Sequence, residues 1–347
     1  MHRKPRAVLA AAIACGLLAA GCSSAAKHAA SSETTLTIGV LTDLTGAAAG
    51  GEASVIPGIK AGIGRAAQEG YHIKYVAADA ATSPTGAQTA AKDLVEQDHV
   101  FAVLAVSALT FAAAGYLKSA GVPVIGAATD GPEWETDSNM FPVEGAADYH
   151  KVWNTVGTFM KMEGVTNMAS LGYGITPSSS LSAKSSAAAA QAEGIKVGYL
   201  NANFPFGAPN VEPVALGIKS AGSNGLYAGV ETSTSFALIT ALRQAGVHLK
   251  APVLPIGYGG DLLSGGAAAE SAAVGVYFPL GFEPAEMHTA ATERFQHDLK
   301  TYAGVSTDPS LNEYFAYVSV DAFVAGLKAA GAHPSQKSLI NAMLGIT

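Results

Sequence analysis

The side chains best suited to chemistry stand where short apolar runs end and helical stretches begin. Ser107 closely follows the apolar run 101–104, and Glu231 and Asp261 stand where later helical stretches begin. Backbone N–H groups at a helix start have no partner inside the helix, so they attract a carboxylate, and nearby hydroxyls complete such a site. This placement indicates binding of a small polar ligand. A serine there also serves as a helix N-cap, and an acid there also favours a helix start through the dipole, so both structural roles stay open.

Motifs of common enzymes and cofactor sites are incomplete in this sequence. The stretch 172–177 follows a predicted strand and begins like a dinucleotide fingerprint, but Pro177 replaces the third glycine and the next strand ends without a ribose-binding acid. His288 and His297 lack helical metal-ligand spacing, and neither a Gly-x-Ser-x-Gly elbow nor a His-Glu-x-x-His motif occurs. We therefore expect no cofactor, no metal and no enzyme activity.

The N-terminus has the pattern of an export signal. Basic residues precede an uninterrupted apolar run at 7–20, which leads into the lipobox-like sequence Leu-Ala-Ala-Gly-Cys at 18–22. The run is shorter than the roughly 20 residues that a spanning helix needs. We predict a signal peptide at 1–21, lipid modification of Cys22 and a flexible tether at 22–34, which would hold the protein at the extracytoplasmic face of the cell membrane.

Charge and cysteine content narrow the class further. Removal of residues 1–21 takes away Cys15 and three of the 20 basic residues, which leaves Cys22 as the only thiol and 17 basic residues against 27 acidic ones. The resulting formal charge of −10 disfavours nucleic acid as a partner. No disulfide can form, so stability must come from apolar cores, and the remaining length suffices for two domains.

From Leu36 the chain alternates short apolar runs with amphipathic stretches, a pattern typical of a parallel sheet covered by helices. The strands predicted first are 36–41, 73–77, 101–104 and 123–125, with a short crossing strand at 140–143, and the helices between them are 53–68, 84–97 and 110–119. A second alternation has helices at 149–162, 181–192, 211–220, 236–244 and 262–268 and strands at 166–171, 195–200, 225–227, 253–256 and 274–278. Helices at 285–301, 309–329 and 336–344 follow. The fold class is therefore α/β, with two modules of similar size.

Several segments, in this order, resemble one known family. They are Ile-Gly-Val-Leu-Thr-Asp-Leu-Thr-Gly at 38–46 with Gly50 and Gly58, Val-Leu-Ala-Val-Ser at 103–107 after Leu94-Val95, Ala-Gly-Val-Pro-Val-Ile-Gly-Ala-Ala-Thr at 120–129, and Leu-Arg-Gln-Ala-Gly at 242–246. Together they resemble the branched-chain amino acid binding proteins of ABC transporters. The resemblance implies a type I periplasmic-binding fold, in which two Rossmann-like lobes are joined by a hinge and the ligand lies at the ends of the sheets. It also implies an ABC transporter permease as partner.

The resemblance further implies how the chain is divided. The first lobe would take residues 35–147 plus 279–330, and the second lobe 148–278. Family members usually continue further and cross once more into the second lobe, so we expect the C-terminal segment 331–347 to belong there. Trp134 is a candidate for the rim of the cleft between the lobes, and Trp153 is expected in a core.

Site residues are carried over position by position. The family places a serine and an Ala-Ala-Thr on the carboxylate side of its ligand and a tyrosine on the other side, which correspond here to Ser107, Ala127, Ala128, Thr129 and Tyr173. The family's glutamate falls on Gly-Tyr-Gly-Gly at 257–260, which lacks an acid. Because a buried ammonium needs a carboxylate partner, Glu231 and Asp261 are the candidates to replace it.

The ligand class therefore stays open among an amino acid, an amide, a carboxylate and an aromatic acid. Two other functions also remain possible on this fold. A ligand-sensing receptor module would share the site and differ in its partner surface, and a lipoprotein enzyme would need a nucleophile and base in the cleft.

Overall fold

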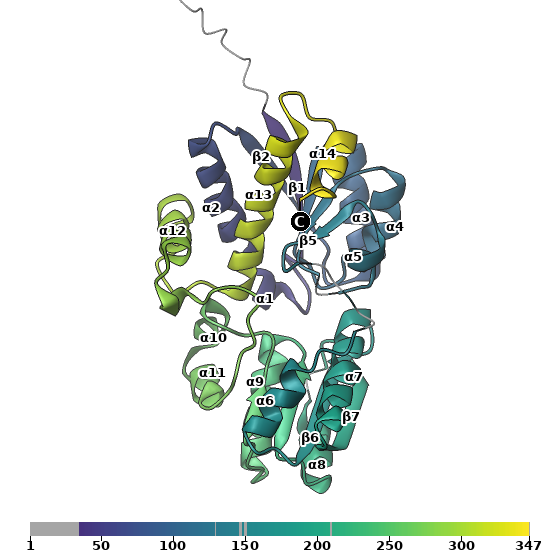
Figure 1. Ribbon diagram of the computed structural model, residues 1–347, viewed down its shortest axis with the longest axis vertical. Helices are drawn as coiled ribbons and strands as arrows, with labels where there is room; N and C mark the ends of the chain where they lie inside the picture. Colours follow the sequence, from purple (N-terminus) through teal and green to yellow (C-terminus); the bar gives the residue numbers. More distant parts are fainter. Residues whose placement is uncertain (1–34, 129, 146–147, 149–150, 209, 347) are drawn as a thin grey trace, which may run out of the picture. The chain divides into compact units, whose positions relative to one another are not determined.

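The computed structural model describes residues 35–128, 130–145, 148, 151–208 and 210–346. The predicted signal peptide at 1–21, the lipidated Cys22 and the tether at 22–34 lie outside the described residues. Strands and helices alternate along the described chain and form two parallel sheets (Figure 1). Each sheet and the helices packed on it define a lobe.

The first lobe is built on a five-stranded parallel sheet with the order β2-β1-β3-β4-β5. Its strands are β1 (Leu36–Thr42), β2 (Ile73–Asp79), β3 (Ala102–Ala105), β4 (Val124–Gly126) and β5 (Met140–Pro142). Side chains of β1 enter both faces of the sheet, since Ile38 and Val40 belong to one apolar cluster and Leu41 to another. Burial on both faces explains why these strands read as continuous apolar runs.

Helices cover both faces of this sheet. They are α1 (Ala49–Glu52), α2 (Val55–Gln68), α3 (Pro84–Glu96), α4 (Phe111–Ser119) and α5 (Glu133–Thr136). The start of α3 is encoded locally, because the Ser83 hydroxyl accepts a hydrogen bond from the Gly86 N–H at 3.0 Å and Pro84 occupies the first helical position.

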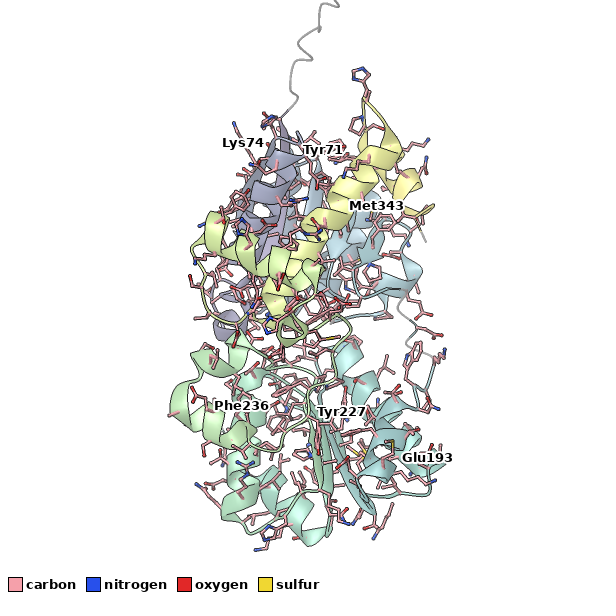
Figure 2. All side chains as sticks on the ribbon, turned by 60° about the vertical axis from the view of Figure 1, so that its left-hand side comes forward. Tyr71, Lys74, Glu193, Tyr227, Phe236 and Met343 are labelled. Atoms are coloured by element: carbon pink, nitrogen blue, oxygen red, sulfur yellow. The ribbon has the colours of Figure 1, made fainter. Side chains whose placement is uncertain are left out.

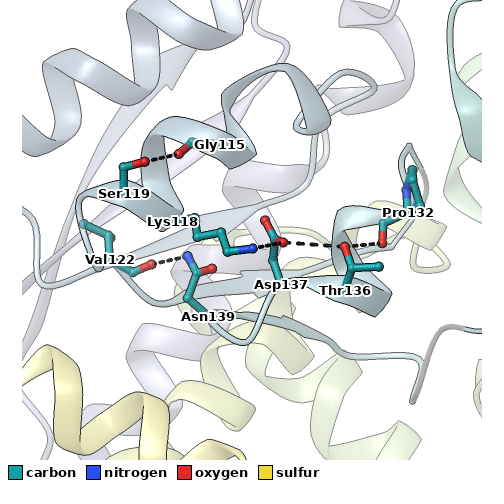
Figure 3. Close-up of polar contacts among 8 residues, drawn as sticks. All are labelled: Gly115, Lys118, Ser119, Val122, Pro132, Thr136, Asp137 and Asn139. Atoms are coloured by element: carbon teal, nitrogen blue, oxygen red, sulfur yellow. Dashed lines mark hydrogen bonds and ion pairs between the residues drawn. The ribbon is translucent and has the colours of Figure 1, made fainter.

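The edge strand β5 is tied to the rest of the lobe by polar contacts (Figure 3). Lys118 Nζ lies 2.6 Å from Asp137 Oδ1, and the Asn139 amide donates to the Val122 carbonyl at 2.8 Å. These contacts link the segment before β5 to the end of α4 and to the residues before β4. The predicted crossing strand at 140–143 forms β5, which pairs in parallel with β4 at the edge of the first sheet.

The second lobe is built on a four-stranded parallel sheet with the order β7-β6-β8-β9. Its strands are β6 (Asn167–Tyr173), β7 (Lys196–Phe204), β8 (Gly225–Gly229) and β9 (Ala251–Val253). Its helices are α6 (Thr155–Met162), α7 (Pro177–Ala192), α8 (Glu212–Ser220), α9 (Thr232–Gln244), α10 (Gly260–Ser264) and α11 (Gly266–Ala273). Met160 and Ala190 belong to the cluster on one face, and Ile218 and Leu238 to the cluster on the other.

The chain then returns to the first lobe. The returning elements are the 3-10 turn η1 (Ala285–Met287), α12 (Ala290–Asp298), the π-helical turn η2 (Leu299–Ala303), α13 (Leu311–Ala330) and α14 (Gln336–Met343). A capping box between Ser310 and Glu313 starts α13. A Cβ added to Gly62 of α2 would lie only 2.6 Å from Val320 Cβ, so glycine permits the close packing of α2 on α13 seen in Figure 1.

The C-terminal segment corrects one expectation. Residues 331–347 were expected to enter the second lobe, but α14 packs on α13 (Figures 1 and 2). Leu339 and Met343 are buried in the same cluster as Ile38 and Phe323 of the first lobe. The physical reason is the apolar face of α14, whose Leu339 and Met343 pack closely against Gly326 of α13.

Three predicted elements also differ from the structure. The stretch 274–278 forms a single bridge, between Tyr277 and Val253, instead of a full strand. The long helix expected at 285–301 is interrupted after η1, where His288 adopts a left-handed φ of 49°. The helix expected at 262–268 is divided into α10 and α11 at Gly266, whose φ is 65°. Local helical periodicity does not report such breaks, since tertiary contacts stabilise them.

Candidate ligand-binding site

A cavity of about 520 Å³ is lined by residues of both lobes. The first lobe contributes Glu52, Ala108, Ala128 and the start of α13, and the second contributes residues at the carboxyl ends of β6 and β8 and along α7. The apolar part of its wall includes Phe206, Tyr227, Ile256, Phe282 and Phe315. A volume of this size suits a small organic molecule, and the position at the strand ends is where α/β sheets bind ligands.

Serines of α7 form the polar floor on the side of the second lobe. The Ser179 hydroxyl accepts from the Tyr173 N–H at 2.7 Å and donates to the Gly229 carbonyl, so it joins β6, α7 and β8. Ser182 shares a short hydrogen bond with the hydroxyl of Tyr227, whose pKa is raised by burial. Sequence reasoning missed this group, although the serine-rich start of α7 after Pro177 is a visible signal.

Tyr173 lies at the end of β6 and on the cavity wall. Its side chain is buried, with the ring stacked on Phe204 and tilted against Phe206. The hydroxyl donates to Thr234 Oγ1 at 3.1 Å and accepts from the Glu231 N–H at 3.2 Å. Burial raises its pKa to about 12, so the phenol stays protonated and fixes the start of α9.

Glu231 also faces the cavity, as the residue immediately before α9. Its side chain makes no capping hydrogen bond to that helix. Burial, with the charges of Asp43 and Asp261, raises the pKa of Glu231 to about 8. The carboxyl group therefore does not cap α9 through a hydrogen bond, although its place at the helix start still suits an acid through the helix dipole.

Asp261 lies away from this cavity. It lines a second hollow beside α9 and α11, which also includes Glu231. The Leu311 N–H donates to the Asp261 carboxyl group, which ties α10 to the start of α13. Burial raises its pKa to about 7, and Oδ2 has no hydrogen-bond partner among the described residues.

Ser107 is buried and bonded within the protein. Its hydroxyl donates to Asp43 Oδ2 at 2.9 Å, and the N–H of Ala108 donates to the same oxygen at 2.8 Å. The other oxygen, Asp43 Oδ1, accepts from the Thr82 N–H at 2.6 Å. Asp43 follows β1 within the 38–46 segment, but sequence reasoning assigned it no role.

The second strand end of the first lobe is arranged in a similar way. Ala127 is buried and donates its N–H to the Ala105 carbonyl, whereas Ala128 lines the cavity. The Ala128 N–H donates to Glu144 Oε2 at 3.2 Å. Desolvation by the surrounding protein raises the pKa of Glu144, which also lines the cavity. Thr129 lies outside the described residues.

The structure adds Glu52, which the sequence did not single out. Its side chain is 8% exposed, lines the cavity, and has Oε2 buried without a hydrogen-bond partner in the described chain. Burial and then the neighbouring charge of Glu231 raise the pKa of Glu52 well above its usual value. No sequence signal separates this acid from a surface residue of a short helix.

Hydrogen bonds with β2 and with α13 hold α1, and with it Glu52, in place. Asp79 Oδ1 accepts from the N–H groups of Leu44 and Thr45 at 2.9 and 3.1 Å. On the other side, the Asn312 amide donates to the Gly51 carbonyl at 2.8 Å. The short helix is therefore fixed to β2 and to α13, and the position of its glutamate follows from the tertiary structure.

The two tryptophans lie in places opposite to those expected. Trp134 is buried, and its Nε1 donates to Asp130 Oδ1 at 2.7 Å. Trp153 is 53% exposed and lines the cavity, with Lys151 Nζ 3.9 Å from its ring centroid. Of the two tryptophans, it is thus Trp153 that lines the cavity.

Among the described residues, no group of three histidine, cysteine or acidic side chains could hold a metal ion. Within the same residues, no helix combines the length and apolar character needed to cross a membrane. The geometry combines an apolar wall, hydroxyls and acidic groups around one volume, which suits binding of a small solute with an apolar body.

A family profile described as periplasmic binding protein matches residues 35–347. No curated protein sequence matches the chain significantly. The family resemblance inferred from the sequence is therefore confirmed by the profile.

Solved structures of similar fold include three solute-binding proteins. A leucine binding protein from Thermotoga maritima superposes with a TM-score of 0.76 at 16% identity, over 89% of this chain and 87% of that one. A solute binding protein of an ABC transporter from R. palustris, in complex with benzoate, gives 0.77 at 18%, over 89% and 85%. A branched-chain amino acid transporter substrate binding protein from Streptococcus pneumoniae, in complex with isoleucine, gives 0.71 at 17%, over 89% and 88%. At these identities the similarity establishes the two-lobed type I fold.

Proposed function

The chain belongs to the periplasmic binding protein family, and on that premise we propose that it captures a small organic solute between its two lobes and delivers it to an ABC importer. The observation that carries this proposal is the cavity of about 520 Å³, to which both lobes contribute side chains. A ligand that touches both lobes stabilises only the conformation in which they are close, so binding is converted into a shape that a transporter can recognise.

The structures of similar fold support the size of the solute. Benzoate and isoleucine are small molecules that combine an apolar body with a charged group. The apolar wall with Phe206, Tyr227 and Phe315, next to hydroxyls and carboxyl groups, suits a molecule of the same kind. No chemical change of the solute is part of this proposal.

We further propose that the protein acts at the outer face of the membrane. The signal peptide at 1–21 would direct export, and acylation of Cys22 would anchor the folded unit through the tether at 22–34. We place the first lobe at residues 35–147 and 279–347, and the second at 148–278, since α14 packs on the first lobe. The permease of the importer is the expected protein partner.

Thermal unfolding in the presence of candidate solutes tests the proposal. The chain from Ser23 onward contains both sheets and every apolar cluster described above, so it is the form to measure. A solute at 100 times its dissociation constant should add about 2.7 kcal/mol to the free energy of unfolding. The panel should contain amino acids, amides, carboxylates, aromatic acids and amines. A selective increase with one class supports solute capture, and no increase with any member, from a cooperatively folded sample, contradicts it.

A further inference from the structure

Two glutamates from different lobes line the same cavity. Neither forms an ion pair with a lysine, arginine or histidine among the described residues. Glu52 comes from the first lobe and Glu231 from the second. The lobes meet here, since a Cβ added to Gly51 would lie 3.3 Å from Glu231 Oε2. The role of this pair is not explained by the fold, and the inference drawn from it rests on the proposed function.

The burial of Glu52 is energetically unfavourable in the unliganded protein. Buried polar groups in proteins almost always have a hydrogen-bond partner, and leaving a carboxyl oxygen without one costs free energy. Glu52 Oε2 is buried without such a partner in the described chain, and the like charge of Glu231 adds to the cost. A buried carboxyl group of this kind on the wall of a cavity indicates that its partner arrives with the ligand.

The charged groups around the cavity favour a cation. Four acids line it in the described chain, namely Glu52, Glu144, Asp148 and Glu231, against one basic residue, Lys151. Lys151 is exposed and its ammonium lies over the ring of Trp153, to which it makes a cation–π contact. This surplus of acidic side chains, which ionise beside a cation, favours a positively charged solute over an anion.

The donors that a ligand carboxylate would need already have acceptors within the protein. Ser107 Oγ and the Ala108 N–H both donate to Asp43, and the Ala128 N–H donates to Glu144. A solute carboxylate at this end of the sheet would compete with two internal carboxyl groups and would be repelled by them. The first lobe therefore offers no free strand-end donor among these three groups.

From this geometry we infer that the solute is an organic amine without a carboxylate, whose ammonium group lies between Glu52 and Glu231 and whose apolar body lies against the aromatic wall. The ammonium donates charge-assisted hydrogen bonds to both carboxyl groups, which are short and strong in a site shielded from water. Because one acid comes from each lobe, the same cation holds both lobes together. The chemical class is set by the two glutamates, and the size by Phe206, Phe282 and Phe315.

The first experiment compares molecules that differ only in their charged groups. Isopentylamine, leucine and 4-methylpentanoate share one apolar body, and phenethylamine, phenylalanine and 3-phenylpropionate share another. Titration calorimetry on the chain from Ser23 onward should show binding of at least one amine, at least 10-fold tighter than the matching amino acid, and no binding of either carboxylate. Tighter binding of an amino acid or carboxylate than of its amine would overturn the inference and leave solute capture intact. Binding of neither amine, when another class in the wider panel binds, would overturn it too. Absence of binding by the whole panel contradicts the proposed function itself.

The second experiment removes each negative charge without changing side-chain shape. Glu52→Gln and Glu231→Gln should each weaken binding of the amine at least 10-fold, because the ammonium loses one carboxylate partner. Glu270→Gln, on the exposed face of α11, is the matched control and should leave the affinity unchanged. Unchanged affinity for the amine in both Glu52→Gln and Glu231→Gln would contradict the inference. Both variants should fold, as neither carboxyl group accepts a described hydrogen bond, and the thermal midpoint without ligand checks this.

A separate measurement reports on the carboxyl groups directly. Both have raised pKa values, so a bound ammonium should ionise them and release protons at pH 7. Calorimetry in two buffers of different ionisation enthalpy measures the number of protons released. We expect net release with the amine and less of it in Glu231→Gln. Proton uptake on binding would contradict the inference, since it would mean that the carboxyl groups of the site gain protons when the solute binds and do not ionise.

Discussion

Two carboxyl groups near the cavity, Asp43 and Glu52, are both buried and lie only nine residues apart, but they have opposite surroundings. Asp43 accepts three hydrogen bonds, from Thr82, Ser107 and Ala108. Glu52 has an oxygen that accepts none in the described chain. The comparison separates an acid that stabilises the fold from an acid that is available to a ligand, and burial alone does not distinguish them.

The largest expected effect concerns the pH dependence of the unliganded protein. The pKa of Glu231 is raised to about 8 and those of Asp130 and Asp261 to about 7, mainly by burial, and the pKa of Glu52 is raised by burial and by Glu231. The folded state therefore retains protons that the unfolded chain releases near pH 4, so stability is lost as pH rises toward 8. We expect the free energy of unfolding, from urea denaturation, to fall by at least about 4 kcal/mol between pH 5 and pH 8.5, because Glu231 alone contributes about 1.4 kcal/mol per pH unit over about three units.

Variants connect this slope to the two glutamates. In a double variant carrying Glu52→Gln and Glu231→Gln, the decrease in stability between pH 5 and pH 8.5 should be smaller than in the parent protein, and Asp130 and Asp261 should account for what remains. Glu270→Gln serves as the control, and its profile should match that of the parent protein. An equally steep profile in the double variant would show that Asp130, Asp261 or other groups cause the pH dependence.

The next effect in size concerns Asp43. Asp43→Ala removes the acceptor of three hydrogen bonds and leaves the buried Ser107 hydroxyl and two backbone N–H groups without it. We expect a loss of about 3 kcal/mol in the free energy of unfolding at pH 7, because buried donors without acceptors are costly. Chemical denaturation measures this loss. Glu52→Ala should cost less under the same conditions, and the reverse order would invalidate the contrast between the two acids.

The smallest effect concerns Ser107. Ser107→Ala removes one of the three donors to Asp43 and creates little empty space, so we expect a loss of about 1 kcal/mol in stability. Because the hydroxyl is engaged with Asp43, affinity for the solute should change less than 2-fold by calorimetry. A large loss of affinity with unchanged stability would restore Ser107 as a direct ligand contact and weaken the distinction between the two regions.

Much of the architecture was predictable from the sequence. The alternation of buried apolar runs with amphipathic stretches predicted each of the nine strands of the two described sheets to within a few residues. Tyr173 and Glu231 were predicted at the site and line the cavity. These features are local, since a strand's burial on both faces and a polar residue at a strand end are visible in a short window.

The role of each acid was decided only by the tertiary structure. Asp43 meets Ser107 because β1 and β3 are neighbours in the sheet, and Glu52 meets Glu231 because α1 and the end of β8 converge on one cavity. Likewise, α14 joined the first lobe because the apolar residues Leu339 and Met343 fit beside α13. The sequence by itself determined most of the segments that become strands and helices, since backbone preference and apolar periodicity are local. The breaks at His288 and Gly266 depended on the tertiary structure. Which carboxyl group gains partners and which stays free depends on residues far apart in the chain, and only folding brings them together.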